Sequence, residues 1–136
     1  MIKNRAAGLV IYKRTKYEIL FLGLIALPHL QKRSNGIYDL PKGQRDPGET
    51  PFECAVRECY EETMIDIQDV VAGPFKDDAL WFWLAESNIN PTIKPNNQTG
   101  ELEHLGYKWM TPDELLENCL DYLKPSIFWA KDTLGV

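Results

Sequence analysis

The sequence has few cysteines, and their spacing matches neither a zinc site nor a disulfide framework. Cys54, Cys59 and Cys119 are odd in number and contain no C-x-x-C pair. Free thiols of this kind suit the reducing conditions of the cytosol. Signal peptides, lipidation motifs, membrane-spanning runs, internal repeats and low-complexity tracts are also absent from the sequence. We therefore expect a cytoplasmic protein.

Basic residues are scarce relative to acidic ones. The chain has 15 lysines and arginines against 20 acidic side chains, which gives a net charge of −5. This balance argues against general binding to nucleic acids or to membranes. An anionic substrate would instead need a metal ion and a few local cations.

The length and composition are those of an ordinary globular domain. The chain has 136 residues, of which 44% are hydrophobic and 26% charged, so it can bury a core without disulfide bonds. We expect residues 1–136 to form a single domain. The sequence leaves the oligomeric state open.

The segment around residue 50 has strong signals for the start of a helix. A loop rich in glycine and proline, Pro41 to Thr50, comes first. Thr50 suits the N-cap, Pro51 suits the first helical position, and Glu53 stands three residues after the cap. This arrangement is a capping box with proline at the first position, and it predicts a helix beginning at Pro51.

The helix would have one apolar face and one acidic face. Spacings of three and four residues produce an apolar stripe of Phe52, Ala55, Val56 and Cys59. Glu58, Glu61 and Glu62 share a different face, where each close pair repels by about 0.2–0.5 kcal/mol. Arg57 is the only cation between residues 54 and 64. The cluster is either a solvated acidic surface or a site for a hard divalent ion such as Mg²⁺ or Mn²⁺.

The same segment resembles the signature of a known hydrolase family. Gly43, Glu49 and the run Arg57-Glu58-Cys59-Tyr60-Glu61-Glu62 have the spacing of the Nudix box, with Met64 in its last place. That box marks hydrolases of nucleoside diphosphates linked to another group. One position differs, because the family usually has glycine where this chain has Thr63. Thr63 would either be strained by about 1–2 kcal/mol in a left-handed conformation or continue the helix.

The resemblance implies an α/β fold, namely the Nudix α/β/α sandwich with a mixed β-sheet. It also implies a Mg²⁺-dependent pyrophosphohydrolase, with Mn²⁺ as an alternative ion, that acts on a small nucleotide substrate. The acids matching the family's metal ligands are Glu58, Glu61 and Glu62. Glu49 would pair with Arg57 and brace the loop against the helix.

Other site residues lie outside this acidic face. Lys42 is placed to contact a substrate phosphate, and Gly43 and Tyr107 are the other candidate substrate contacts. Glu103 is the candidate for a further metal ligand and for the base that accepts a proton from the attacking water. Glu58 is the alternative base.

Apolar runs along the rest of the chain predict further strands and helices. The expected strands are Arg5–Lys13, Tyr17–Ile25, Ile37–Leu40, Ile65–Phe75, Ala79–Glu86 and Leu102–Met110. The expected helices after the first are residues 112–118, capped by Thr111, and Pro125–Leu134, ended by Gly135. Residues 26–36 and 87–100 are expected as loops, and the latter is long enough for a lid or a binding loop.

The sequence gives only partial guidance on the substrate. The Ala6-Ala7-Gly8 start, the run from Leu40 to Gly43 and the segment from Glu103 to Trp109 are similar to the diadenosine tetraphosphate hydrolase branch of the family. A dinucleoside polyphosphate is therefore the first expectation. Nucleoside triphosphates, 5′-pyrophosphorylated RNA and diphosphoinositol polyphosphates stay open, as does a nucleotide-sensing module without turnover.

Overall fold

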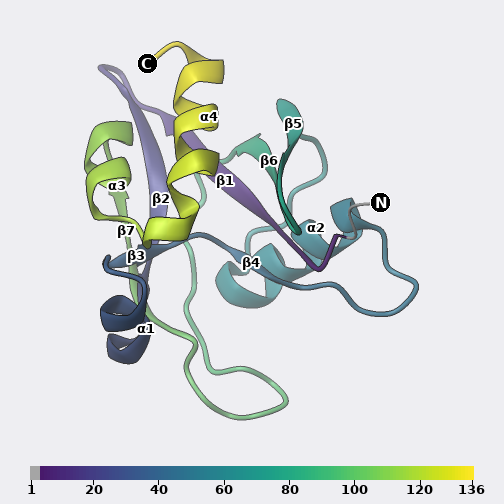
Figure 1. Cartoon of the computed structure of the whole chain (residues 1–136). Helices are drawn as coiled ribbons and strands as arrows, with labels where there is room; N and C mark the ends of the chain where they lie inside the picture. The colour runs from purple at the N-terminus through teal and green to yellow at the C-terminus, as the bar shows by residue number, and fades with distance from the viewer. Residues whose placement is uncertain (1–3) are drawn as a thin grey trace.

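The computed structural model describes residues 4–136, which form a mixed sheet of seven strands with helices on both faces (Figure 1). The strands are β1 (Ala6–Arg14), β2 (Ile19–Ala26), β3 (Tyr38–Asp39), β4 (Lys42–Gln44), β5 (Ala72–Asp77), β6 (Leu80–Glu86) and β7 (His104–Met110). The helices are α1 (Pro28–Arg33), α2 (Pro51–Thr63), α3 (Pro112–Asn118) and α4 (Lys124–Leu134), with a 3₁₀ turn at Asp121–Leu123. No helix within residues 4–136 is long and apolar enough to cross a membrane.

Strand β1 lies at the centre of the sheet. The strand order is β3-β2-β1-β6-β5, with β4 also pairing with β1 and β7 pairing with β2. Strand β1 runs parallel to β6 and antiparallel to β2 and β4, so the sheet is mixed. The predicted α/β class is confirmed.

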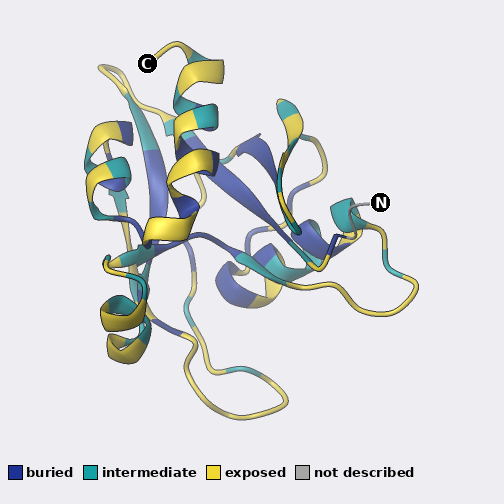
Figure 2. Ribbon diagram, viewed as in Figure 1, coloured by how far each residue is buried: buried dark blue, intermediate teal, exposed yellow. Residues whose placement is uncertain are grey.

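Alternation along β1 divides the core between the two faces of the sheet. Val10 and Tyr12 belong to the cluster under α3 and α4, whereas Leu9 and Ile11 belong to the cluster under α2. These residues are almost completely buried, and the burial colours follow β1 as the dark centre of the molecule (Figure 2). The helices therefore form the outer layers of an α/β/α sandwich.

The strand predicted at Ala79–Glu86 is confirmed as β6, and its side chains alternate between the two core clusters. Phe82 and Leu84 pack in the cluster under α3 and α4, and Trp83 packs in the other cluster. The Trp83 ring meets the Phe52 ring of α2 edge-on, with 5.3 Å between centroids. Trp81 is partly buried against the same cluster, so both tryptophans of β6 serve core packing.

Four other predicted elements were wrong in part. The strand expected from residue 65 begins only at Ala72, because Ile65 and Ile67 bury their side chains under α2 without joining the sheet ladder. The loop expected at 26–36 contains α1, which begins at Pro28 in the first helical position. The loop after residue 40 contains β4, and the strand expected from residue 102 begins at His104.

The structure at the end of α2 changes which residue is seen to differ from the Nudix box. Thr63 is the last helical residue, and its hydroxyl donates to the Cys59 carbonyl at 2.6 Å. The left-handed residue is Met64, with φ 63°, so of the two alternatives predicted for Thr63 the one in which it continues the helix is confirmed. The family's glycine therefore corresponds to Met64, and the fully buried Ile65 fills the apolar place after it.

Candidate active site

Helix α2 begins as predicted, and its capping box fixes its direction. The Thr50 hydroxyl accepts from the Glu53 amide at 3.1 Å, and the Glu53 carboxylate accepts from the Thr50 amide at 2.9 Å. Cys54, Ala55 and Cys59 are buried against β1 and its neighbours. Packing of this apolar face leaves the acidic face of α2 directed away from the sheet core.

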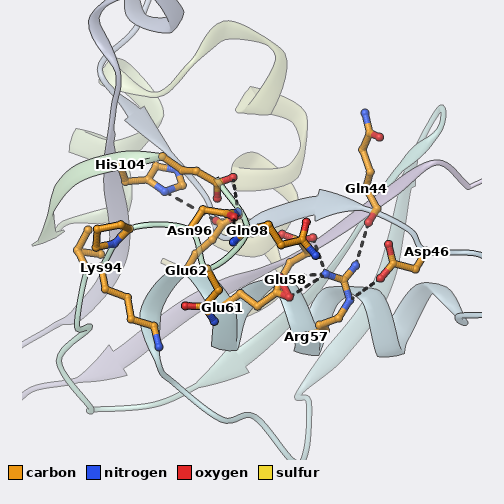
Figure 3. Close-up of a pocket in the computed structure, with 14 residues that line it drawn as sticks. Gln44, Asp46, Arg57, Glu58, Glu61, Glu62, Lys94, Asn96, Gln98 and His104 are labelled. Atoms are coloured by element: carbon orange, nitrogen blue, oxygen red, sulfur yellow. Dashed lines mark hydrogen bonds and ion pairs between the residues drawn. The ribbon is translucent and has the colours of Figure 1, made fainter. Parts of the chain in front are cut away.

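The acidic face lines a cleft of about 350 Å³ (Figure 3). Three segments that are distant in sequence form its walls: α2, the chain just after β4, and the long loop between β6 and β7. The side chains that line it include Arg57, Glu58, Glu61, Glu62, Glu103, His104, Gln44, Asp46, Lys94, Asn96 and Gln98. Four of these are predicted metal-binding acids, so the fold brings all four to one cleft.

Arg57 is the centre of an ion-pair network at one wall of this cleft. Its guanidinium donates to Glu49 at 2.7 and 3.0 Å, to Glu58 at 2.8 Å and to Glu61 at 3.0 Å. It also donates to the carbonyl of Gln44 at 2.9 Å. The hydrogen bond from Arg57 lowers the pKa of Glu49. The Glu49–Arg57 pair expected from the resemblance is therefore present and ties the loop to the helix.

Burial affects Glu58 more than its ion pair does. Desolvation raises the pKa of Glu58, although Arg57 acts in the opposite direction. Gly43 lies directly beside this carboxylate, and a Cβ atom at residue 43 would overlap it. The absence of a side chain at Gly43 therefore makes room for Glu58.

Glu62 is the most buried acid of the cleft, with 8% of its surface exposed. Desolvation raises its pKa well above the usual range, and the nearby charge of Asp39 adds to the effect. One carboxylate oxygen accepts from the backbone amide of Lys42 at 3.3 Å. The Nδ1 atom of His104 lies 3.9 Å from the same oxygen.

Glu103 reaches the cleft from outside the helix. It is exposed and accepts from the Asn96 side chain at 3.3 Å, which links it to the long loop. Its sequence neighbour Glu101 does not line the cleft. Of these two acids, which are close together in the sequence, only Glu103 therefore lines the cleft.

The donor set of the cleft fits a hard divalent cation. Carboxylate oxygens are the preferred ligands of such ions, and the buried Glu62 pays a desolvation cost that a cation would offset. Within residues 4–136, no three acidic, histidine or cysteine side chains already converge on one metal position. Arg57 instead holds Glu58 and Glu61. Of these two acids, Glu61 is the more exposed, with 51% of its side chain accessible, and can turn toward an ion.

The predicted substrate contacts lie elsewhere. The Lys42 ammonium binds Asp39 at 2.9 Å, and with Gly43 and Tyr122 it lines a second hollow of about 560 Å³. Burial lowers the pKa of Lys42, but the charges and hydrogen bonds of Asp39 and Tyr122 together outweigh it and raise that pKa. Tyr107 is partly exposed on β7 and lines neither hollow.

Several residues of the site carried no usable signal in the sequence. Gln44, Asp46, Lys94, Asn96 and Gln98 are common loop residues that only the fold brings to the cleft. Asp39 lies just before the Pro-Lys-Gly run, and its partner His104 is 65 residues away. No spacing rule connects positions so distant in the chain.

Comparisons with known proteins show the family to which the chain belongs. Residues 3–128 match the NUDIX domain model, which confirms the resemblance seen in the sequence. An asymmetrical bis(5′-nucleosyl)-tetraphosphatase from Sus scrofa is 33% identical over 124 residues, covering 81% of this chain and 80% of the relative.

Solved structures share the fold over nearly the whole chain. A binary complex of the C. elegans Ap4A hydrolase superposes with a TM-score of 0.70 at 22% identity, covering 99% of this chain and 98% of that one. The NUDIX domain of Shewanella oneidensis NrtR, solved with ADP ribose, has a TM-score of 0.68 at 17% identity and covers 98% and 90%. These two likenesses establish the sandwich fold.

Proposed function

Because the chain belongs to the Nudix family and is a hydrolase of phosphoanhydride bonds, we propose that it is a Mg²⁺-dependent pyrophosphohydrolase of dinucleoside polyphosphates. The observation that carries this proposal is the convergence of Glu58, Glu61, Glu62 and Glu103 on one cleft. The substrate class is supported by relatives named as bis(5′-nucleosyl)-tetraphosphatases at about 30% identity.

The helical acids and Glu103 would hold the divalent ion. When bound, such an ion would lower the pKa of the attacking water and neutralise charge on the bridging phosphate oxygens. Mn²⁺ is the alternative ion, since it accepts the same oxygen ligands. Glu61 would exchange its contact with Arg57 for this role, whereas Glu49 keeps Arg57 in place.

We assign proton transfer to Glu103. Water would attack one phosphorus of the polyphosphate chain, its proton would pass to the Glu103 carboxylate, and the phosphorus–oxygen bond to the leaving phosphate would break. Glu103 suits this role because it enters the cleft from the end of the long loop before β7, whereas Arg57 lies on α2. Glu58 is the alternative base.

Polar groups of the long loop would contact the polyphosphate. Lys94 is the one cation of the cleft besides Arg57, and Asn96 and Gln98 add neutral donors. Lys42, Gly43 and Tyr107 are proposed substrate contacts on the resemblance alone. We also propose a cytoplasmic location, which the three free, buried cysteines support.

A substrate panel tests the proposal. The purified protein is incubated with Mg²⁺, Mn²⁺ or EDTA and one substrate: diadenosine tetraphosphate, a nucleotide sugar, a nucleoside triphosphate, a diphosphoinositol polyphosphate or 5′-triphosphorylated RNA. We expect the highest kcat/KM on diadenosine tetraphosphate, with unequal products and no turnover in EDTA. A higher kcat/KM on another substrate would refute the substrate class, and nucleotide binding without turnover would identify a sensor.

A further inference from the structure

Asp39 is a buried acid beside the cleft, and three donors converge on it. It is 4% exposed, and it accepts from the Leu40 amide at 2.8 Å, the Lys42 ammonium at 2.9 Å and the His104 Nε2 atom at 3.0 Å. Burial would raise the pKa of Asp39, but the bond from His104 and the charge of Lys42 hold it below the usual value. Asp39 is therefore an ionised, fully engaged carboxylate that does not itself line the cleft.

The sheet brings Asp39 and His104 together across β2. Leu24 of β2 pairs with Asp39 on one side, and Ala26 pairs with His104 on the other. A register shift between residues 25 and 26 adjusts the start of β7 at this point. The ring of His104 thereby crosses to the Asp39 carboxylate, and both side chains are buried.

Lys42 and His104, two of the three residues that donate to Asp39, both lie next to the same carboxylate oxygen of Glu62. The backbone amide of Lys42 donates to Glu62 Oε1 at 3.3 Å, and the Nδ1 atom of His104 lies 3.9 Å from it. An ionised Asp39 can only accept hydrogen bonds, so His104 donates to it through Nε2–H. The Nδ1 atom of the same ring is the one that faces Glu62. The 3.9 Å contact is too long for a hydrogen bond, so the ring limits the position of Glu62 by packing.

We propose that Asp39 is a positioning residue of the cleft, which anchors Lys42 and His104 beside the Oε1 atom of Glu62 and so fixes how that carboxylate points into the cleft. This inference rests on the proposed function, since it assumes that Glu62 binds the divalent ion. A metal ligand held in one orientation loses less freedom on binding than one that samples several rotamers. Groups that orient metal ligands typically change metal affinity or activity about 10- to 100-fold when they are removed.

The direct test is Mn²⁺ binding to the substrate-free protein, measured by calorimetry. Asp39→Asn keeps the size of the side chain but removes the charge that holds both partners. We expect it to weaken Mn²⁺ binding about 10- to 100-fold. We expect a much smaller change in KM for the substrate, a split that general loss of structure would not produce. Asp113→Asn is the matched control, because Asp113 is an exposed acid paired with Lys131 away from the cleft.

Two substitutions of His104 keep the inference testable if Asp39→Asn does not fold. A glutamine amide can place its nitrogen where the His104 Nε2 atom lies and so retain the bond to Asp39. The shorter asparagine can replace only the Nδ1 position. We therefore expect His104→Gln to bind Mn²⁺ more tightly than His104→Asn, with similar melting temperatures.

The outcomes separate this inference from the proposed function. Tight Mn²⁺ binding by the wild type, together with unchanged binding in Asp39→Asn, would refute the positioning role alone. Equal affinities of His104→Gln and His104→Asn would refute it as well. A wild-type protein that bound no Mn²⁺ would refute the proposed function, and the positioning role with it.

Discussion

Arg57 and Glu49 form a two-point ion pair between the helix and the loop that precedes it. The guanidinium Nε and Nη2 atoms lie 2.7 and 3.0 Å from the two carboxylate oxygens. Such bidentate pairs are among the stronger hydrogen-bonded interactions in proteins. Glu49 comes one residue before the N-cap Thr50, so the pair fixes the loop at the point where the chain enters α2.

We predict that Glu49→Gln destabilises the protein by about 1.5–3 kcal/mol, because hydrogen bonds to charged groups contribute about this much. Urea unfolding at pH 7 measures the loss. Asp46→Asn is the control, since Asp46 contacts the same guanidinium at 3.5 Å but is 66% exposed. Asp46→Asn should lower the free energy of unfolding by less than about 1 kcal/mol, the usual range for a surface ion pair. Equal losses in both variants would contradict the special role of Glu49.

The contribution of Glu49 should also depend on pH. Arg57 lowers the pKa of Glu49, so the stabilisation is complete above the unfolded value, about 4.3 for glutamate. It is lost as the pH falls through the lower folded value. We therefore expect the stability difference between wild type and Glu49→Gln to shrink in urea titrations carried from pH 7 to pH 3. A difference that stays constant over this interval would show that the ion pair is not its source.

Glu62→Gln should change stability and activity in opposite directions. Burial raises the pKa of Glu62, so the charged form is costly in the metal-free protein, and glutamine removes that cost. We expect a higher melting temperature without metal, a smaller increase on adding millimolar Mg²⁺ and a loss in kcat of about 100-fold or more. Thermal denaturation with and without Mg²⁺ and steady-state kinetics measure these effects. A near-normal kcat in Mg²⁺ would show that Glu62 is not a metal ligand.

Local chemistry made parts of this fold predictable. Thr50, Pro51 and Glu53 determine the start of α2 within four residues of chain, and the observed capping box uses the same three. Strand β6 was predicted from its apolar run, and in the structure its alternating side chains pack on two different layers. In both elements the local preference and the tertiary packing agree.

Other features depend on contacts that no short window of sequence contains. The chain after α2 has the composition of a strand, but Ile65 and Ile67 are buried without strand partners. Asp39 and His104 meet only because β3 and β7 both pair with β2. The sequence thus predicted the acids that face the cleft, while the residues that support them became visible only in the folded sheet.

Met64 is the position where glycine should stabilise the protein. Its φ of 63° is left-handed, a conformation that costs a residue with a Cβ atom about 1–2 kcal/mol. Met64→Gly should therefore raise the free energy of unfolding by about 1 kcal/mol, reduced by the loss of the partly exposed side chain. Thr63→Gly is the contrasting variant, because it removes a helical residue and the hydroxyl bond to Cys59. It should destabilise, and urea unfolding of both variants distinguishes the two positions.

The candidate base Glu103 lines the cleft and accepts a hydrogen bond from Asn96, whereas Glu101, only two residues earlier, does not line the cleft. If Glu103 accepts the proton of the attacking water, Glu103→Gln should lower kcat by about 100-fold or more while Glu101→Gln keeps nearly full activity. Initial rates at saturating substrate and Mg²⁺ give the kcat of both variants.

Binding and chemistry can be separated in the same pair of variants. Glu103 is also a proposed metal ligand, so Mn²⁺ affinity is measured beside kcat. If Glu103 acts mainly as the base, Glu103→Gln should show a large loss in kcat, while its Mn²⁺ affinity stays within a few-fold of the wild type. Parallel losses of affinity and kcat would make Glu103 a ligand rather than the base. Equal, modest losses of kcat in Glu101→Gln and Glu103→Gln would instead favour Glu58 as the base. Burial already raises the pKa of this alternative base.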